Sequence, residues 1–326
     1  MNPAKCDELD YIHFMIAAQR AFSCTEAARC QPEDTQAPAH DAFTRLLARQ
    51  PPDTEALWQE IGGLVNLAGG LLILHKPYAQ NIQLVTRHWS GKHRRVVLGI
   101  NLITLLWTAE AALIPTDFRV YDKPIGGKNQ NEHFRDLLAQ AQGRGFQPGY
   151  VLFDSWYSSL ENLKQVRSYG WRWLTQLKSN RQVNPDGRGN RAISTVDIGP
   201  EGRQVHLKGY GFIKVFRTVA PNGDAEYWAT NNLALSAHEH ERLSREAWAI
   251  ENYHRGIKQC CGVEKAQVRS ARAQVRHISF SLRAFVRLEV HRLKTVVSWY
   301  EAKAAIIRDA IRQYLAQPLY HLNSTA

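Results

Sequence analysis

The run of apolar residues at 96–114 constrains the fold most, because it is nearly long enough to cross a lipid bilayer. Polar residues interrupt it at Asn101, Thr104, Thr108 and Glu110. The run is also rich in β-branched residues, which favour strands over helices. Two buried strands joined by a turn fit this pattern better than a membrane helix, so we expect a buried sheet and no membrane partner.

Neighbouring apolar runs extend this sheet. Residues 69–75 form one strand before the long run, and residues 112–122 form the last of three consecutive strands, which predicts a meander. A helix at 131–142 ends at Gly143 and leads to a short strand at 149–153. A second helix at 159–169 and a strand at 171–179 complete a strand-helix-strand unit. Such a unit predicts parallel pairing with a right-handed crossover, and hence an α/β fold with a mixed sheet.

Helical periodicity disappears between about residues 180 and 232, where turn signals separate short alternating strands. The pair Asn222-Gly223 is the strongest hairpin signal in the chain. We interpret this segment as a β-rich insertion in an α/β domain that spans residues 67–326. Periodicity returns at about residue 237, continues to Gln259, and is followed by basic carboxy-terminal helices.

Residues 1–66 are predicted to form a separate helical region. Its first helix begins near Asp7, and Ser23 is placed to cap the second. The third helix is basic at its end, with Arg45 and Arg49. Short helices of this kind resemble a helix-turn-helix module that contacts DNA through those arginines, although an ordinary helical cap on the main domain gives the same pattern.

The charge of the chain narrows its partners. Its 41 Lys and Arg residues exceed its 30 Asp and Glu residues, which gives a net charge of +11. DNA, RNA or an anionic membrane would each satisfy that balance. The 5 cysteines form no CxxC pair, so we expect reduced thiols in the cytoplasm and no structural zinc.

Asp154 is the first candidate for chemistry. It directly follows the buried strand at 149–153 and precedes a loop that starts the next helix. Carboxyl ends of strands are where α/β sheets place their ligands. An Asp that merely caps a turn would explain the same position.

Glu251 is the second candidate, on the predicted helix that runs to Gln259. Helical spacing puts Arg255 and Lys258 on the same side, while His254 belongs to the apolar stripe. An acid beside two cations is commonly a surface salt-bridge ladder. Alternatively, the acid binds a metal ion and the two cations grip a phosphate backbone.

Several segments resemble insertion-sequence transposases of bacteria, in the DDE superfamily with its ribonuclease H-like fold. The resemblance covers nearly the whole chain. Its segments are HWSGKHRRVVLGINLITLLW, FRVYDK, FDSWYSSLENLK, WAIENYHRGIKQ and the amino-terminal DYIHFMIAAQRAFSCTEAARC.

This resemblance implies a site and a reaction. Asp154 matches the second acid of the family, Glu251 the third, and Lys258 a lysine that contacts DNA. Three acids normally hold two Mg²⁺ or Mn²⁺ ions, which activate the attacking oxygen and stabilise the leaving one. The family cuts the ends of its own element and joins them to target DNA, so we expect DNA as partner, a homodimer in a synaptic complex, and a cytoplasmic, nucleoid-associated protein.

Two departures qualify the resemblance. The family usually has an Asp-Asp-Thr-like motif after its first core strand, whereas here Leu74 runs straight into His75 and the KPYA segment. His75, Asp117 and Asp122 are the candidates to replace the missing acid, but a neutral imidazole bridges two hard cations poorly. The second departure lies before Glu251, where Ser244 and Ala247 occupy the positions of a tyrosine and an arginine in the commonest signature.

We therefore expect a transposase whose catalysis is impaired by loss of the first acid. The alternative is a non-catalytic DNA-binding remnant or an inhibitor of intact copies, and a general nuclease of the same fold is a third reading. Two further features stay open. We expect Trp156 and Tyr157 to pack on the sheet, and stacking on a distorted DNA end is the alternative. The arginines of the carboxy-terminal helices either track phosphates or form ordinary solvated faces.

Overall fold

The structure is a computed structural model that describes residues 5–32, 37–49, 54–75, 78–79, 86–90, 95–121, 127–219 and 223–318. The side chains at position 75 and between positions 78 and 99 lie outside this description. The chain divides into two compact units. Unit 1 consists of Met1–Leu57 with Arg255–Ala326, and unit 2 of Trp58–His254.

A mixed sheet forms the centre of unit 2, and ten strands in the described part of the chain belong to it. Its longest path runs in the order β10-β11-β12-β7-β6-β1-β4-β2, with β3 and β5 also paired to β4. The strands before the insertion are β1 (Leu71–His75), β2 (Tyr78–Ala79), β3 (Thr86–Ser90), β4 (Arg95–Ala109), β5 (Ala112–Tyr121), β6 (Tyr150–Phe153) and β7 (Trp173–Leu177). The predicted meander is confirmed as β1, β4 and β5, with β2 and β3 as additional short strands.

Strand direction changes at β1. It pairs antiparallel with β4 on one side and parallel with β6 on the other, and β6 in turn pairs parallel with β7. The predicted parallel unit is therefore confirmed. Because β1 and β6 run in the same direction, their carboxyl ends meet at one edge of the sheet.

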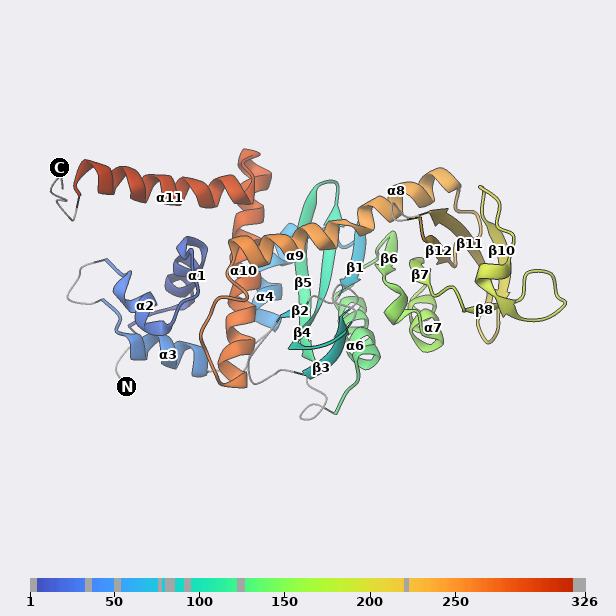
Figure 1. Ribbon diagram of the computed structural model, residues 1–326, viewed down its shortest axis with the longest axis horizontal. Helices are drawn as coiled ribbons and strands as arrows, with labels where there is room; N and C mark the ends of the chain where they lie inside the picture. Colours follow the sequence, from blue (N-terminus) through green and yellow to red (C-terminus); the bar gives the residue numbers. More distant parts are fainter. Residues whose placement is uncertain are drawn as a thin grey trace. The chain divides into compact units, whose positions relative to one another are not determined.

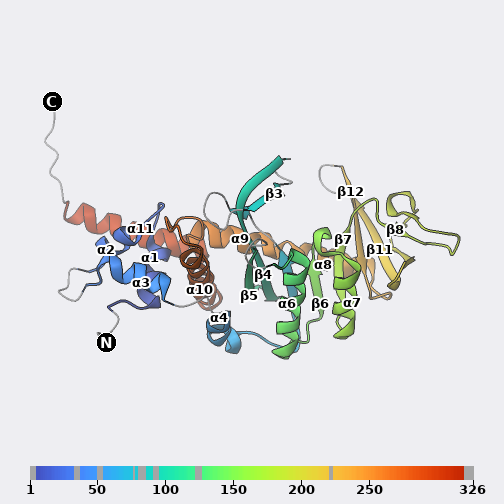
Figure 2. The same cartoon turned by 90° about the horizontal axis from the view of Figure 1, so that it is seen from below.

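Helices cover the two faces of this sheet (Figure 1). On one face, α6 (Gln130–Gly143) packs its Phe134 ring against Phe153 of β6. The helix α7 (Leu160–Ser168) lies beside α6, and Arg135 joins them through a 3.0 Å ion pair to Glu161. The opposite face carries α8 (Ala237–Ala247), as the view from below also shows (Figure 2).

The β-rich insertion continues the sheet beyond β7. It contains β8 (Gln182–Val183), β9 (Arg191–Ala192), β10 (Arg203–Leu207), β11 (Gly211–Val219) and β12 (Ala225–Thr230), and the short 3-10 helix η3 (Ile193–Thr195). His240 of α8 stacks on Phe216 of β11 at 4.3 Å, which fixes that helix over the extended sheet. The expected hairpin is confirmed, because β11 and β12 pair antiparallel on either side of Asn222-Gly223.

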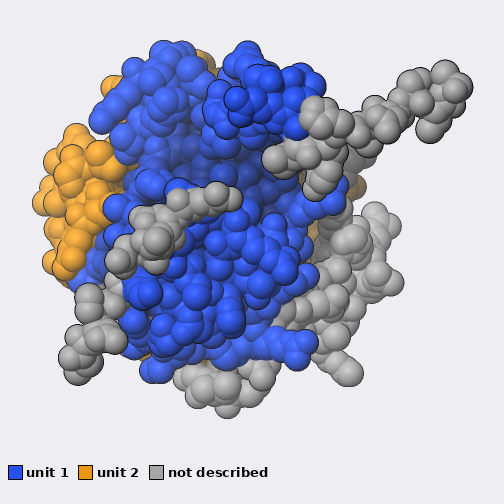
Figure 3. Space-filling view, turned by 90° about the vertical axis from the view of Figure 1, so that its left-hand side faces the viewer, with its two compact units in different colours: residues 1–57, 255–326 blue, residues 58–254 orange. Residues whose placement is uncertain are grey.

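Unit 1 joins the two ends of the chain in one body, coloured blue in Figure 3. Its helices are α1 (Glu8–Ala17), α2 (Cys24–Arg29), α3 (His40–Ala48), α10 (Ala271–Thr295) and α11 (Trp299–Ala316). The boundaries between the units fall within α4 (Thr54–Ile61), which the 3-10 helix η1 (Gly62–Leu64) follows, and within α9 (Ala249–Cys260). As predicted, the Ser23 side chain caps α2 by accepting from the Glu26 backbone N–H.

Buried polar contacts hold α1 against α10. Glu8 forms ion pairs with Arg276, at 2.8 Å, and with Arg283. The Tyr11 hydroxyl lies 3.2 Å from Nδ1 of His277, whose Nε2 lies 3.0 Å from the Gly262 carbonyl oxygen. Because a carbonyl only accepts, Nε2 carries a proton. Burial of the ring lowers the pKa of His277 and so favours the neutral imidazole.

These contacts decide, for two of the carboxy-terminal arginines, whether the side chain is solvated. Arg276 is buried and Arg283 is nearly so, and both stabilise the packing of α1, so they are not solvated arginines available to phosphates. One expectation about the helices was wrong. The helix predicted to run unbroken to Gln259 ends at Ala247, and a new helix, α9, begins at Ala249 after the exposed Trp248.

The apolar run that opened the sequence comprises the core strands β4 and β5, as predicted. Among the described residues, no helix is both long enough and apolar enough to span a bilayer.

The buried imidazole of His277 makes the stability of unit 1 depend on pH. Burial lowers the pKa of His277 from 6.5 to about 4. Between these values the unfolded chain binds a proton that the folded chain does not, so stability falls as the pH drops from about 6.5 towards 4. The loss at the acid end is on the order of 3 kcal/mol, because each unit of pKa shift corresponds to about 1.4 kcal/mol.

We predict that His277→Gln, which keeps a polar group but does not titrate, flattens this dependence. Melting temperatures measured between pH 7 and pH 4.5 should fall less for the variant than for the parent chain. His240, whose pKa burial also lowers to about 4, remains in both proteins and accounts for a residual slope. Equal slopes for the two proteins would show that His277 is not the titrating group.

Candidate active site

Asp154 stands at the carboxyl end of β6, where a network of hydrogen bonds fixes its backbone and side chain. One carboxylate oxygen accepts from the Trp156 backbone N–H at 2.8 Å, which caps the short 3-10 helix η2 (Ser155–Tyr157). The buried Thr175 hydroxyl of β7 donates to the Asp154 carbonyl oxygen at 3.1 Å. Asp154 therefore does cap a turn, as the simpler reading of the sequence proposed, and it is also held at the sheet edge.

The register of the sheet places position 75 beside position 154. Leu74 of β1 pairs with Phe153 of β6, and each is followed directly by one of these two positions. On its other side, position 75 pairs with Thr104 of β4, which is fully buried. An acid at position 75 would thus belong to the same row as Asp154, yet the residue there is His75.

Asp117 is not brought to this edge as a ligand. It pairs with Leu105 of β4, which pairs with Leu74 of β1, which in turn pairs with Phe153 of β6. Asp117 therefore lies on the same face of the sheet as Phe153, whose ring contacts α6. Its carboxylate is engaged with Arg119 at 2.6 Å and with Arg144, just after α6, at 3.6 Å.

Burial raises the pKa of the Asp117 carboxyl, and the two arginines oppose that shift. The Asp117 carboxylate is thus engaged with arginines on the α6 face of the sheet, which argues against a replacement role. Asp122 lies outside the described residues.

Glu251 lies in the first turn of α9, half-buried, and its backbone N–H donates to the Trp248 carbonyl at 3.1 Å. The buried stripe of α9 consists of Ile250, Tyr253, His254 and Ile257. His254 is therefore a core histidine, as expected. Whether the carboxylates of Glu251 and Asp154 meet is a prediction of the family resemblance.

The cations expected to contact DNA are all on helices or helix ends of unit 1. Lys258 pairs with Glu264 at 2.8 Å, and Arg45 pairs with Asp41 at 2.6 Å. Arg255 and Arg49 are exposed. Surface pairs of this kind contribute little to stability. The DNA contacts of these four cations stay a prediction.

The aromatic pair next to Asp154 divides between core and surface. Tyr157 is fully buried and stacks on Phe134 at 5.0 Å. Trp156 is 51% exposed, and the Lys178 ammonium lies 5.7 Å from the centre of its ring. Packing on the sheet was thus the right expectation for Tyr157 and the wrong one for Trp156. Sequence reasoning missed Lys178, although it follows β7 directly, as Asp154 follows β6.

The described residues do not form a complete metal site. Within the described ranges, no three His, Cys, Asp or Glu side chains are grouped so that they could hold a metal ion. Asp154 offers a carboxylate of which one oxygen already accepts a hydrogen bond. Two hard divalent ions require more oxygen ligands than this one carboxylate supplies.

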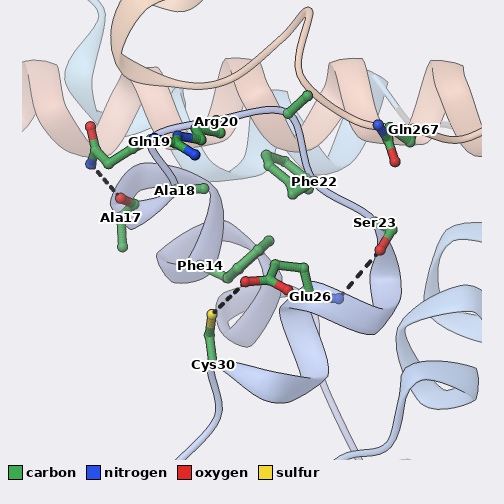
Figure 4. A pocket seen from close by; sticks show the side chains of 11 residues that line it. Phe14, Ala17, Ala18, Gln19, Arg20, Phe22, Ser23, Glu26, Cys30 and Gln267 are labelled. Carbon is green, nitrogen blue, oxygen red and sulfur yellow. Dashed lines mark hydrogen bonds between the residues drawn. The ribbon is translucent and has the colours of Figure 1, made fainter. Parts of the chain in front are cut away.

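A separate cavity of about 570 Å³ lies in unit 1, far along the chain from Asp154 (Figure 4). Phe14 and Phe22 contact edge to face at 4.9 Å in its wall. Its polar lining includes Gln19, Ser23 and Glu26, which make hydrogen bonds to neighbouring groups within unit 1. It contains neither candidate acid.

Comparison with solved structures shows which fold this is. The piggyBac transposase in its synaptic complex with hairpin DNA aligns with a TM-score of 0.55 at 9% identity, over 98% of this chain and 76% of that one. At this identity the likeness shows a shared ribonuclease H-like transposase fold, which confirms the predicted fold class.

Two further structures align less well. The Drosophila P element transposase strand transfer complex has a TM-score of 0.31 at 9% identity, covering 97% of this chain and 87% of that one. The Mos1 strand transfer complex has a TM-score of 0.24 at 10% identity, covering 94% and 80%. Scores this low do not indicate a shared fold.

Sequence comparison assigns the family independently of the fold. No curated protein matches the sequence significantly. The family model described as a transposase DDE domain matches residues 92–286, which is more than half of the chain and includes both candidate acids. The chain therefore belongs to the DDE-domain transposase family.

Proposed function

We propose that this protein is an insertion-sequence transposase that binds the DNA ends of its element but cleaves and joins strands poorly. The observation that carries this proposal is the register of β1 and β6, which puts His75 at the position beside Asp154. The family uses divalent metal, and an imidazole in place of a carboxylate weakens a site for Mg²⁺ or Mn²⁺.

DNA binding is supported by charge and by family membership. The chain carries a net charge of +11, and its binding cations in this proposal are Arg45, Arg49, Arg255 and Lys258. Residues 1–66 act as the DNA-binding region, and two copies assemble on paired element ends. The protein acts in the bacterial cytoplasm, at the nucleoid.

A second function follows from the same substitution. A chain that binds ends without cutting them would occupy the sites of intact transposase and inhibit it. The proposed pairing of Asp154 with Glu251, without a third acid, favours this reading as much as it favours a weak enzyme.

Restoring the acid tests the catalytic part of the proposal. We predict that His75→Asp increases strand cleavage by roughly 10²- to 10³-fold, because metal ions contribute several kcal/mol to charge stabilisation and each 1.4 kcal/mol is about tenfold in rate. The measurement is cleavage of labelled DNA carrying ends selected by the protein from a random pool, with Mg²⁺ or Mn²⁺.

His75→Asn is the matched control, since it has the size of Asp without its charge. A second variant inserts an Asp-containing loop between Leu74 and His75, in case the short connection alone is at fault. Robust cutting by the unaltered chain would overturn the claim of impairment. If neither restored variant cuts and both still bind the selected ends, the proposed role of position 75 is wrong.

Salt dependence tests the binding part. We predict that the logarithm of DNA affinity falls linearly with the logarithm of salt concentration, and that Arg255→Gln or Lys258→Gln each lowers the slope by about 1. Lys128→Gln serves as the control, because Lys128 pairs with Asp136 on the α6 side of unit 2. An affinity that does not change with salt concentration would contradict the assignment of Arg255 and Lys258 to DNA binding. A Lys128→Gln variant whose salt slope falls as that of Arg255→Gln does would contradict it too.

A further inference from the structure

We propose that Trp156 and Lys178 form a binding site for one unpaired nucleotide at the DNA end, with the base on the indole and its phosphate near the ammonium. This inference rests on the proposed function, because it specifies the DNA that the site beside Asp154 accepts. It concerns two side chains that have no role in the proposed function, in which the acids bind metal and the helix cations bind DNA.

The turn that presents Trp156 is rigid. Its neighbour Tyr157 is anchored in the core on Phe134, and the Trp156 backbone N–H is held by Asp154. The Ser158 hydroxyl closes the turn by donating to the Ser155 carbonyl at 2.8 Å. A ligand that stacks on this indole therefore orders little of the protein, which lowers the entropic cost of binding.

The exposure of the indole is unusual for its setting. Tyr157 and Ser158 beside it are buried, yet half of the Trp156 surface faces solvent. Leaving a large apolar ring in water forgoes the free energy that burial would provide. An indole that is fixed in an exposed position at the edge of a candidate active site is typical of a binding surface.

Lys178 adds a charge to the aromatic surface. Its ammonium, 5.7 Å from the ring centre, is within range of a cation–π interaction, which steadies the orientation of the ring. It emerges at the end of β7, the strand adjacent to β6, so ring and cation belong to the same edge of the sheet. Together they offer a π surface and a positive charge, as proteins that bind single-stranded nucleic acid do.

The chemistry selects an unpaired nucleotide over a paired one. Bases inside a duplex already stack on one another, whereas an unpaired base exposes its π surface to the protein. Trp156 is two residues from Asp154, so the nucleotide it holds lies next to the phosphate on which the proposed site acts. The surface formed by Trp156 and Lys178, called the platform below, would therefore favour DNA ends that are frayed or unpaired at the reacting position.

The test measures the affinity of the full chain for two short duplexes of the same sequence. One is blunt, and the other carries a tail of a few unpaired nucleotides with 2-aminopurine as the first unpaired base. We expect tighter binding of the tailed duplex and quenching of its fluorophore on stacking. Trp156→Ala should reduce tailed-duplex affinity about 5- to 150-fold, the range for loss of one stacked base, and leave blunt-duplex affinity nearly unchanged.

Matched variants separate the platform from other effects. Trp156→Phe keeps an aromatic surface and should retain most of the preference, whereas Lys178→Gln should lower the salt slope by about 1. Phe212→Ala is the control, because Phe212 is a 63% exposed aromatic on β11, separated from β6 by β12 and β7. It should bind both duplexes as the parent chain does.

The outcomes distinguish this inference from the proposed function. If the parent chain binds neither duplex in a salt-dependent manner, the proposed function fails. If it binds both equally, or if Trp156→Ala keeps the preference for the tailed duplex, the platform is wrong while DNA binding stands. Because Trp156 is half exposed, the melting temperature of the Trp156→Ala variant should be close to that of the parent chain. A large decrease would show a structural role for Trp156 instead.

Discussion

The parallel pairing of β1 with β6 is the contact on which the candidate site depends. Along the chain, the strands β2 to β5 and the helix α6 separate β1 from β6, yet their register joins Leu74 to Phe153. The pairing is possible because the intervening helix crosses one face of the sheet and returns the chain in the same direction. It brings positions 75 and 154 to one edge, so the proposed metal site depends on the residue types at those two positions.

Asp154 combines a structural and a proposed chemical role in one side chain. Its carboxylate caps η2, and its carbonyl is held by Thr175, so the backbone at the sheet edge is fixed before any ligand arrives. Fixing the acid in this way favours catalysis only when its partner acids are fixed as well. In the proposed function, histidine in place of an acid at position 75 removes a charge that the pair of ions requires, while the exposed indole beside Asp154 is proposed to bind DNA.

The sequence predicted the order and direction of the strands well, because apolar runs and turn residues act locally. Asn222-Gly223, for example, indicates its hairpin without help from the rest of the chain. Contacts between distant segments were harder to foresee. Nothing near Asp117 in the sequence indicates that Arg144 approaches it, and adjacent Trp156 and Tyr157 have similar hydrophobicity, although only Tyr157 meets the Phe134 ring. The break of the helix at Trp248 was likewise not predicted, because the helical periodicity of the sequence continues through that residue.

Net charge alone does not locate a DNA-binding surface, because some of the cations form buried contacts within the fold. Arg276 and Arg283 neutralise Glu8, and the buried ammonium of Lys303 donates to the carbonyls of Ile16, Ala18 and Cys260. These cations join α1 to α10 and α11 and are shielded from any polyanion, since a buried charge exchanges its partners only at a large desolvation cost. In the proposed function, the electrostatic attraction for DNA therefore comes from surface cations such as Arg255 and Lys178, and the positions of these cations determine where a phosphate backbone can lie.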